Sequence, residues 1–344
     1  LRLDAGGLLP AVVCPDRGTV ASTPTLIDAL EPLAPRAEVA ELFDFPARRG
    51  FLPFGLTAYE GVTRLLPNHR LDLGDWRTER VWPGPEIHAA PLLTEAEAKA
   101  LVPDVVARVR GHVAGVLGDG PGRLYLSGGR DSRMVLAAAR EVRDRMTCET
   151  MVNESGMDRH VAGRVAAAAG VPLVLTPIVP SSRDEVAAWI RRAGNTLYDP
   201  VTELAATARL NDRGMHVLTG TCAEIARASN WWEEDLAAPA PSVEVLLNRL
   251  RLPDVPVVRD AAEAWLAGLP PIDATMALDV AKIEQIHGCW AAVSVYGHMT
   301  AWPSLSPFAN QRIYETALRL PKAYKFGQGF YADFMKASWP ELLE

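Results

Sequence analysis

The chain has 344 residues, 49% of them hydrophobic and 22% charged, which allows one large or two ordinary globular domains with sizeable cores. The formal net charge of −7 argues against a general nucleic-acid-binding protein, and the longest apolar runs are far too short to span a membrane. The first residues lack the basic region and long apolar core of a secretory signal, so we expect a cytoplasmic protein that binds neither nucleic acid nor membrane.

The four cysteines, Cys14, Cys148, Cys222 and Cys289, are widely spaced along the chain. Their spacing matches no metal-binding pattern, and a disulfide framework is unusual in a chain of this length. We expect them to be small buried residues in a reducing compartment.

Residues 1–92 contain many prolines and glycines and only short apolar runs, which predicts an irregular, strand-rich region. The segment 93–117 then has apolar residues at helical spacing. Thr94, followed three residues later by Glu97, is typical of a helix N-terminus. This change predicts a small N-terminal domain over residues 1–94 and a larger domain over residues 95–344.

The larger domain begins with short apolar segments that alternate with helical ones. The predicted strands are 123–127, 146–152, 171–178 and 215–220, and the predicted helices between them are 131–145, 157–170 and 182–194. Such alternation is typical of an α/β fold in which helices cover both faces of a parallel sheet. Beyond residue 240 the pattern predicts a helical C-terminal portion, with helices near 242–250, 257–268, 275–297, 309–320 and 329–338.

The string SGGRDS, Ser127 to Ser132, lies between the first predicted strand of this sheet and its helix. Ligands of open parallel sheets bind at the carboxyl ends of strands. Gly128 and Gly129 let the backbone approach a ligand closely, the amides that open the helix attract anions, and the two serines add hydroxyl donors. These features predict a phosphate-binding loop. The alternative is a tight turn in which Asp131 or Ser132 caps the helix.

Asp131 adds a negative charge to this predicted anion site. A carboxylate beside phosphate is repelled unless a cation lies between them, so Asp131 predicts a bridging Mg²⁺. Neither GxxxxGK[ST] nor GxGxxG occurs in the chain, which excludes the Walker P-loop and the dinucleotide-binding fingerprint.

SGGRDS resembles the pyrophosphate-binding loop SGGxDS of the ATP pyrophosphatase superfamily. Segments 218–229 and 306–321 are similar to the synthetase domain of asparagine synthetase and β-lactam synthetase, and segment 55–73 resembles the end of that family's glutaminase domain. The resemblance implies an adenine nucleotide α-hydrolase-like fold that uses ATP and Mg²⁺. It implies that the nucleotide contacts Leu126, Ser127, Gly128, Gly129, Asp131, Ser132, Met151, Val152 and Gly220.

Several family positions carry different residues here. The second metal-binding Asp of the family is Ala223, whereas the following Glu matches Glu224. Glu224 is therefore expected either as a metal ligand beside Asp131 or as a base for the attacking amine. Arg227, three residues on, is expected to pair with Glu224 or to reach a phosphate or carboxylate, and the alternative is a solvated pair of side chains.

The C-terminal part also departs from the family. Pro303 and Leu305 replace two charged residues, and Tyr331 stands where the resemblance places a lysine that acts late in the reaction. Lys325 and Lys336 are the nearby lysines, and of these Lys325 is the predicted catalytic residue.

The resemblance implies an ATP-dependent ligase that adenylates a carboxylic acid, releases pyrophosphate and transfers the acyl group to an amine. The first 94 residues lack the glutaminase cysteine, so the amine is expected from a substrate or from free ammonia, in specialised biosynthesis. One alternative is an intramolecular cyclase similar to β-lactam synthetase or a lasso-peptide cyclase. Another is a degenerate ATP-binding partner protein. The expected partners are a small carboxylic acid and an amine, and a homodimer is left open.

Overall fold

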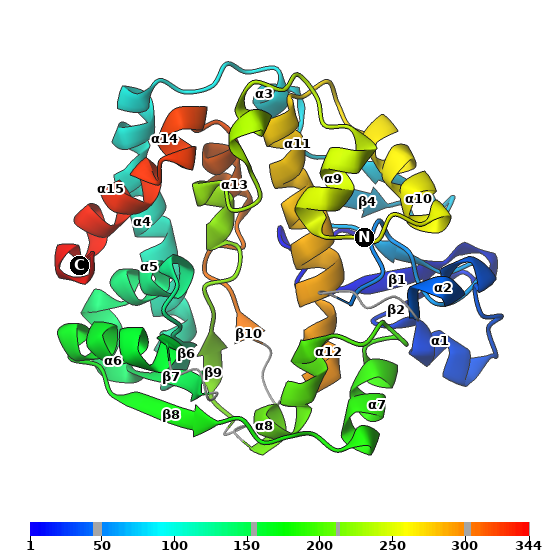
Figure 1. Ribbon diagram of the computed structural model, residues 1–344, viewed down its shortest axis with the longest axis horizontal. Helices are drawn as coiled ribbons and strands as arrows, with labels where there is room; N and C mark the ends of the chain where they lie inside the picture. Colours follow the sequence, from blue (N-terminus) through cyan, green and yellow to red (C-terminus); the bar gives the residue numbers. More distant parts are fainter. Residues whose placement is uncertain (44–49, 153–156, 211–213, 299–303, 344) are drawn as a thin grey trace. The chain divides into compact units, whose positions relative to one another are not determined.

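The computed structural model of the chain, shown in Figure 1, describes residues 1–43, 50–152, 157–210, 214–298 and 304–343. The chain forms two compact units. The N-terminal unit comprises Leu1–Ala90, Pro180–Ala206 and Asn230–Met299, and the sheet unit comprises Pro91–Val179, Thr207–Ser229 and Thr300–Glu344. The predicted functional boundary near residue 95 stays a prediction, because a spatial grouping does not test where a functional domain begins.

The sheet unit contains a five-stranded parallel sheet with the strand order β10-β9-β6-β7-β8. Its strands are β6 (Gly122–Tyr125), β7 (Met146–Val152), β8 (Leu173–Pro177), β9 (His216–Leu218) and β10 (Ser304–Leu305). Helices flank this sheet, as Figure 1 shows, which confirms the predicted α/β class. All four strands predicted from the sequence are present, and β10 is an addition.

The order of the strands creates a switch point beside β6. Helix α5 (Arg130–Ala138) connects β6 to β7, and α6 (Met157–Ala169) connects β7 to β8. The chain then returns to the opposite side of β6 as β9. The loops after β6 and β9 therefore leave the sheet side by side, and such switch points are where open α/β sheets bind ligands.

Helix α5 is shorter than the predicted helix over 131–145. It ends at Ala138, and a 3₁₀ segment follows over Arg140–Arg145. The backbone N–H of Ala139 donates to the carbonyls of both Val135 and Leu136, which tightens the last turn.

The remaining helices of the sheet unit pack around these elements. Thr94 and Glu97 form the predicted capping box at the start of α4. The buried valines of α4 form one face, and α4 contacts both α5 and α15. These helices are α4 (Glu95–Gly118), α13 (Gln311–Leu318), α14 (Lys322–Phe326) and α15 (Gly329–Ser338), of which only α14 has no counterpart among the predicted elements.

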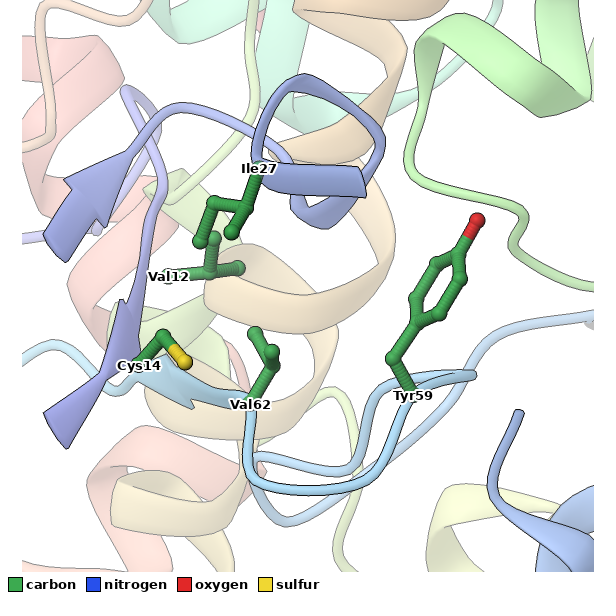
Figure 2. Close-up of a cluster of buried hydrophobic side chains, with 5 residues drawn as sticks. All are labelled: Val12, Cys14, Ile27, Tyr59 and Val62. Atoms are coloured by element: carbon green, nitrogen blue, oxygen red, sulfur yellow. The ribbon is translucent and has the colours of Figure 1, made fainter. Parts of the chain in front are cut away.

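The N-terminal unit contains two small antiparallel sheets, which confirms the predicted strand-rich start. One has the order β2-β1-β3 and the other pairs β4 with β5. The strands are β1 (Ala11–Cys14), β2 (Thr19–Ala21), β3 (Thr63–Leu65), β4 (His69–Leu71) and β5 (Thr78–Arg80). Figure 2 shows one core cluster of this unit, made by Val12, Cys14, Ile27, Tyr59 and Val62, with the Tyr59 hydroxyl directed away from the other four side chains.

Helices complete the N-terminal unit. The predicted helix over 275–297 consists of α11 and α12 joined by a π-helical segment, Lys282–Ala291, whose first eight residues are buried. The helices are α1 (Pro24–Leu30), α2 (Ala40–Phe43), α3 (Pro85–His88), α7 (Arg183–Arg192), α9 (Val243–Leu250), α10 (Pro256–Ala267), α11 (Ala274–Ala281) and α12 (Val293–His298), and α8 (Ala205–Leu210) crosses into the sheet unit.

The four cysteines are buried and carry free thiols, as expected from their spacing. Burial raises the pKa of Cys148 to about 12 and that of Cys289 to about 11, so both thiols stay protonated at neutral pH. In the described part of the chain, every helix is too short or too polar to cross a lipid bilayer.

Candidate functional site

The loops that follow β6 and β9 meet at the switch point of the sheet. Gly220, two residues after β9, lies against the first turn of α5. A Cβ atom at this position would be 2.5 Å from the carbonyl carbon of Asp131 and would also overlap the backbone nitrogen of Ser132. Only glycine therefore allows the two loops to approach this closely.

Side chains of the SGGRDS loop hold its backbone in shape. The Ser132 Oγ accepts a hydrogen bond from the Ser127 amide at 3.2 Å, and the Ser127 Oγ accepts one from the Gly129 amide at 3.1 Å. The Gly128 amide donates to the Asp158 carboxylate at 2.8 Å. Leu126 anchors the loop to β7, because its carbonyl accepts from the Thr150 hydroxyl at 2.6 Å.

The N-terminus of α5 directs its amides towards the loop. Gly129 is the N-cap residue, and no side chain caps this end of the helix. The alternative prediction, a turn capped by Asp131 or Ser132, therefore does not describe the structure. The uncapped amides and the positive end of the helix dipole favour an anion here.

Asp131 forms a two-pronged ion pair with Arg227. The Arg227 Nε donates to Oδ1 at 2.6 Å and its Nη2 donates to Oδ2 at 2.5 Å. This pairing is the main reason that the pKa of Arg227 is raised, and Glu224 and Tyr331 add smaller electrostatic contributions. Arg227 therefore reaches a carboxylate, which was one of its expected partners, and that carboxylate belongs to Asp131 of the other loop.

The backbone around Arg227 fixes the direction of its side chain. A 3₁₀ turn over Ala223–Arg227 lies between Cys222 and Ala228, which both have left-handed backbone angles, with φ of 76° and 53°. The Gln328 side-chain amide donates to the Arg227 carbonyl at 2.9 Å. These constraints aim the guanidinium across the switch point at α5.

A cavity of about 510 Å³ opens beside the loop, with the lining residues Gly128, Gly129, Arg130, Arg133, Arg227, Tyr331 and Leu343. Among the described residues, this lining contains three guanidinium groups and no carboxylate. The Arg130 guanidinium lies over the Tyr331 ring, 5.6 Å from its centroid. The Arg133 Nε is buried and makes no hydrogen bond within the described part of the chain. The positive charge of these guanidinium groups therefore favours an anion in the cavity.

The other predicted site residues lie outside this lining. Met151 and Val152 are half-buried at the end of β7, where they pair with Thr176 and Pro177 of β8. Glu224 is half-buried in the 3₁₀ turn and close enough to Arg227 to raise its pKa.

The two lysines considered as catalytic groups also lie outside the cavity lining. Lys325 is fully buried, and its Nζ donates to the Ala317 carbonyl at 2.9 Å. Lys336 is exposed and contacts Asp333 at 3.5 Å. Lys325 as the catalytic residue stays a prediction. Pro303 lies outside the described residues, and Leu305 is half-buried on β10.

The predicted Mg²⁺ site at Asp131 and Glu224 does not fit this arrangement. Both oxygens of Asp131 accept hydrogen bonds from Arg227, and the guanidinium would repel a metal ion placed beside them. Among the described residues, no group of three or more His, Cys, Asp or Glu side chains is arranged to hold a metal.

Asp158, Gln328 and Leu343 contribute to the site, and sequence reasoning did not identify them. Asp158 bonds the Gly128 amide, Gln328 holds the Arg227 backbone, and Leu343 lines the cavity. Each lies far along the chain from the residue that it contacts, and none belongs to a motif. Comparison of the sequence with models of known families and with curated proteins finds no match.

Proposed function

We propose that this chain is an ATP-dependent, AMP-forming carbon–nitrogen ligase similar to the synthetase domain of asparagine synthetase and β-lactam synthetase. The observation that supports this proposal is the cavity beside the SGGRDS loop, which is lined by three guanidinium groups next to the N-terminus of α5 at a sheet switch point. Its volume of about 510 Å³ lies within the range of roughly 300–1,000 Å³ that is usual for small-molecule sites.

The proposed reaction has two steps. A carboxylate oxygen of the acid attacks the α-phosphorus of ATP, the bond between the α-phosphorus and the bridging oxygen breaks, and pyrophosphate leaves. An amine then attacks the acyl carbon, AMP leaves, and the amine gives up a proton. Glu224 is the proposed base for that proton, because it lies beside the cavity residue Arg227.

The protein would act mainly through position and charge. Negative charge builds up on the leaving pyrophosphate as the α–β bond breaks. Arg130, Arg133 and Arg227 line the cavity next to the loop and would neutralise that charge. Guanidinium groups suit this task because their planar donors match pairs of phosphate oxygens.

A second function is favoured by one observation. Asp131, the acidic residue of the loop, is engaged by Arg227, and Lys325 is buried against a backbone carbonyl. A chain that has lost catalytic groups in this way could bind ATP without turning it over and act as a partner protein. Pyrophosphate release separates the two functions.

The deciding experiment measures AMP and pyrophosphate formed from ATP in the presence of a panel of carboxylic acids and amines, with products followed by mass spectrometry. AMP and pyrophosphate formed only with a particular acid would support the ligase. A product from one organic substrate alone would indicate a cyclase, whereas two substrates would indicate an intermolecular ligase. Formation of ADP and phosphate would contradict the proposal, and ATP binding without turnover would favour the partner protein.

A matched pair of variants links the activity to the cavity. Arg133→Ala removes a lining guanidinium, whereas Arg108→Ala removes an exposed arginine of α4 in the same unit. We expect the first variant to lower pyrophosphate release at least about tenfold, because a charge-assisted hydrogen bond contributes about 1.5–3 kcal/mol. The second should leave the rate unchanged.

A further inference from the structure

We infer that Arg227 supplies the cation that this loop uses to bind the polyphosphate chain, so that binding there needs no divalent metal ion. Asp131 is then a positioning residue for Arg227. This inference rests on the proposed nucleotide-binding function and specifies how the site recognises its ligand.

The first support is the state of the Asp131 carboxylate. Each of its oxygens accepts a short hydrogen bond from the same guanidinium, at 2.6 and 2.5 Å. A metal ligand must offer at least one oxygen to the ion. Here an ion at either oxygen would lie beside the positive charge of Arg227, and the two cations would repel each other.

The second support is that the guanidinium is fixed before any ligand binds. Asp131 holds its Nε and Nη2, and Gln328 holds the backbone carbonyl of the same residue. The left-handed residues Cys222 and Ala228 set the path of the chain on either side of the turn. A group that is already ordered loses little entropy when a ligand arrives, which favours binding.

The third support is what the guanidinium still offers to the cavity. Within the described residues, Nε and Nη2 donate to Asp131, and Nη1 makes no hydrogen bond. Arg227 lines the cavity together with Arg130 and Arg133. Phosphate oxygens in the cavity would therefore meet a set of guanidinium donors that carries out the neutralisation usually given to a metal ion.

The test measures binding of inorganic pyrophosphate and of α,β-methylene-ATP to the full chain by calorimetry. Buffer passed over a chelating resin is compared with the same buffer containing magnesium chloride. A resin is preferred to EDTA because a polyanionic chelator would itself enter a cavity lined by arginines. We expect dissociation constants in metal-free buffer within about threefold of those in magnesium.

One result would contradict metal-free binding alone, and another would contradict the nucleotide site as a whole. Binding that appears only with magnesium overturns the metal-free inference and leaves the proposed ligase intact. Absence of binding in both buffers overturns the nucleotide site itself, and the proposed function fails with it.

The variant Asp131→Asn distinguishes a positioning residue from a metal ligand, because the two roles predict opposite changes in pyrophosphate affinity. Its amide oxygen can still accept a hydrogen bond from Arg227, but the competing negative charge is gone. We expect pyrophosphate to bind severalfold more tightly in metal-free buffer, because the anion no longer shares the guanidinium with a carboxylate. If Asp131 were a metal ligand, the same variant would weaken binding in magnesium.

The variant Arg227→Ala tests the cation directly. We expect it to lose at least about tenfold in pyrophosphate affinity in metal-free buffer, and magnesium should restore part of that loss because the ion supplies positive charge to the phosphates. Arg227→Lys keeps the charge but not the two-pronged geometry, so it should bind with intermediate affinity. Arg108→Ala is the control for a lost surface charge. An Arg227→Ala protein that binds pyrophosphate normally without metal would refute the inference.

Discussion

Each unit contains an arginine that holds a carboxylate in a two-pronged pair, and the two pairs differ in their surroundings. In the N-terminal unit, Arg249 donates to Asp235 at 2.8 and 3.0 Å, and the two side chains are 4% and 2% exposed. The Trp232 ring lies 3.7 Å from the Arg249 guanidinium. In the sheet unit, the side chains of Arg227 and Asp131 are 22% and 24% exposed, and the arginine lines a cavity.

We take this difference to separate a pair that stabilises the fold from a pair that, in the proposed function, serves a ligand. Removing one partner of an enclosed pair leaves a charge buried without compensation, which costs several kcal/mol. A half-buried pair that water can reach contributes less to stability, since water can replace either partner. It can, however, keep donors directed at an open cavity.

The largest effect is expected at the enclosed pair. Asp235→Ala should lower the free energy of unfolding by about 3–5 kcal/mol, because Arg249 loses its buried counter-ion. Urea unfolding measures this change. The control is Glu234→Ala, which removes the 65%-exposed carboxylate that contacts the same arginine and should cost less than about 1 kcal/mol. Equal costs for the two variants would contradict the distinction.

Acid should destabilise the N-terminal unit through His298. Burial, and then the charge of Arg192, lower the pKa of His298 from 6.5 to about 4, and the Trp189 Nε1 donates to its neutral Nδ1 at 3.2 Å. In the unfolded chain the His298 ring therefore takes up a proton below pH 6.5, whereas in the folded chain it stays neutral until about pH 4. This stabilisation is complete above pH 6.5 and is lost as the pH falls towards 4, to an extent of about 2–3 kcal/mol.

Urea unfolding at pH 7.5 and pH 4.5 measures this loss. His298→Gln removes the titrating ring and should show a smaller difference between the two pH values. A variant with the same pH dependence as the parent chain would rule out His298 as the cause.

Gly220→Ala tests the close approach of the two loops of the sheet unit. The new methyl group would overlap the backbone of Ser132, so the loops must separate. We expect a loss of about 1–3 kcal/mol in stability and at least tenfold in pyrophosphate affinity, because Arg227 moves with its loop. Gly163→Ala is the control, since a Cβ there meets nothing within 4 Å.

The smallest effect on stability is expected at the open pair. Asp131→Ala should change the free energy of unfolding by less than about 1 kcal/mol, although it changes the binding site. Thermal and urea unfolding measure this difference. A cost comparable with that of Asp235→Ala would mean that both pairs stabilise the fold, and the comparison between the units would fail.

Local patterns predicted much of the fold. The strand over 146–152 and the helix over 329–338 have the predicted bounds, and Gly170 follows α6 with a left-handed φ of 65°. The patterns failed where neighbours in space decide the geometry. The helix over 131–145 ends early in a 3₁₀ segment, and the helix over 275–297 contains a π-helical segment, because apolar spacing does not distinguish these forms from a continuous α-helix.

Only the local part of the candidate site was predicted, because its contacts between distant residues are also decided by neighbours in space. The loop and its place at the end of a strand followed from residue types alone. The pairing of Asp131 with Arg227 did not, because 96 residues separate them. Spacing placed Arg227 beside Glu224 on one helix, whereas the 3₁₀ turn and the left-handed residues at its ends direct the side chain to the other loop.

The path of the chain through the sheet unit determines the order in which the parts of the cavity are made during translation. Strands β6, β7 and β8 are complete before residue 180. Gly220 and Arg227 come after Pro180–Ala206, a segment of the N-terminal unit, and Tyr331 comes after its next segment, Asn230–Met299. A nascent chain on the ribosome thus carries the SGGRDS loop long before it carries the arginine that pairs with Asp131. The cavity closes only when residues as distant as Gly128 and Leu343 have both been made. The proposed nucleotide site would therefore form only after the chain has been made as far as Leu343.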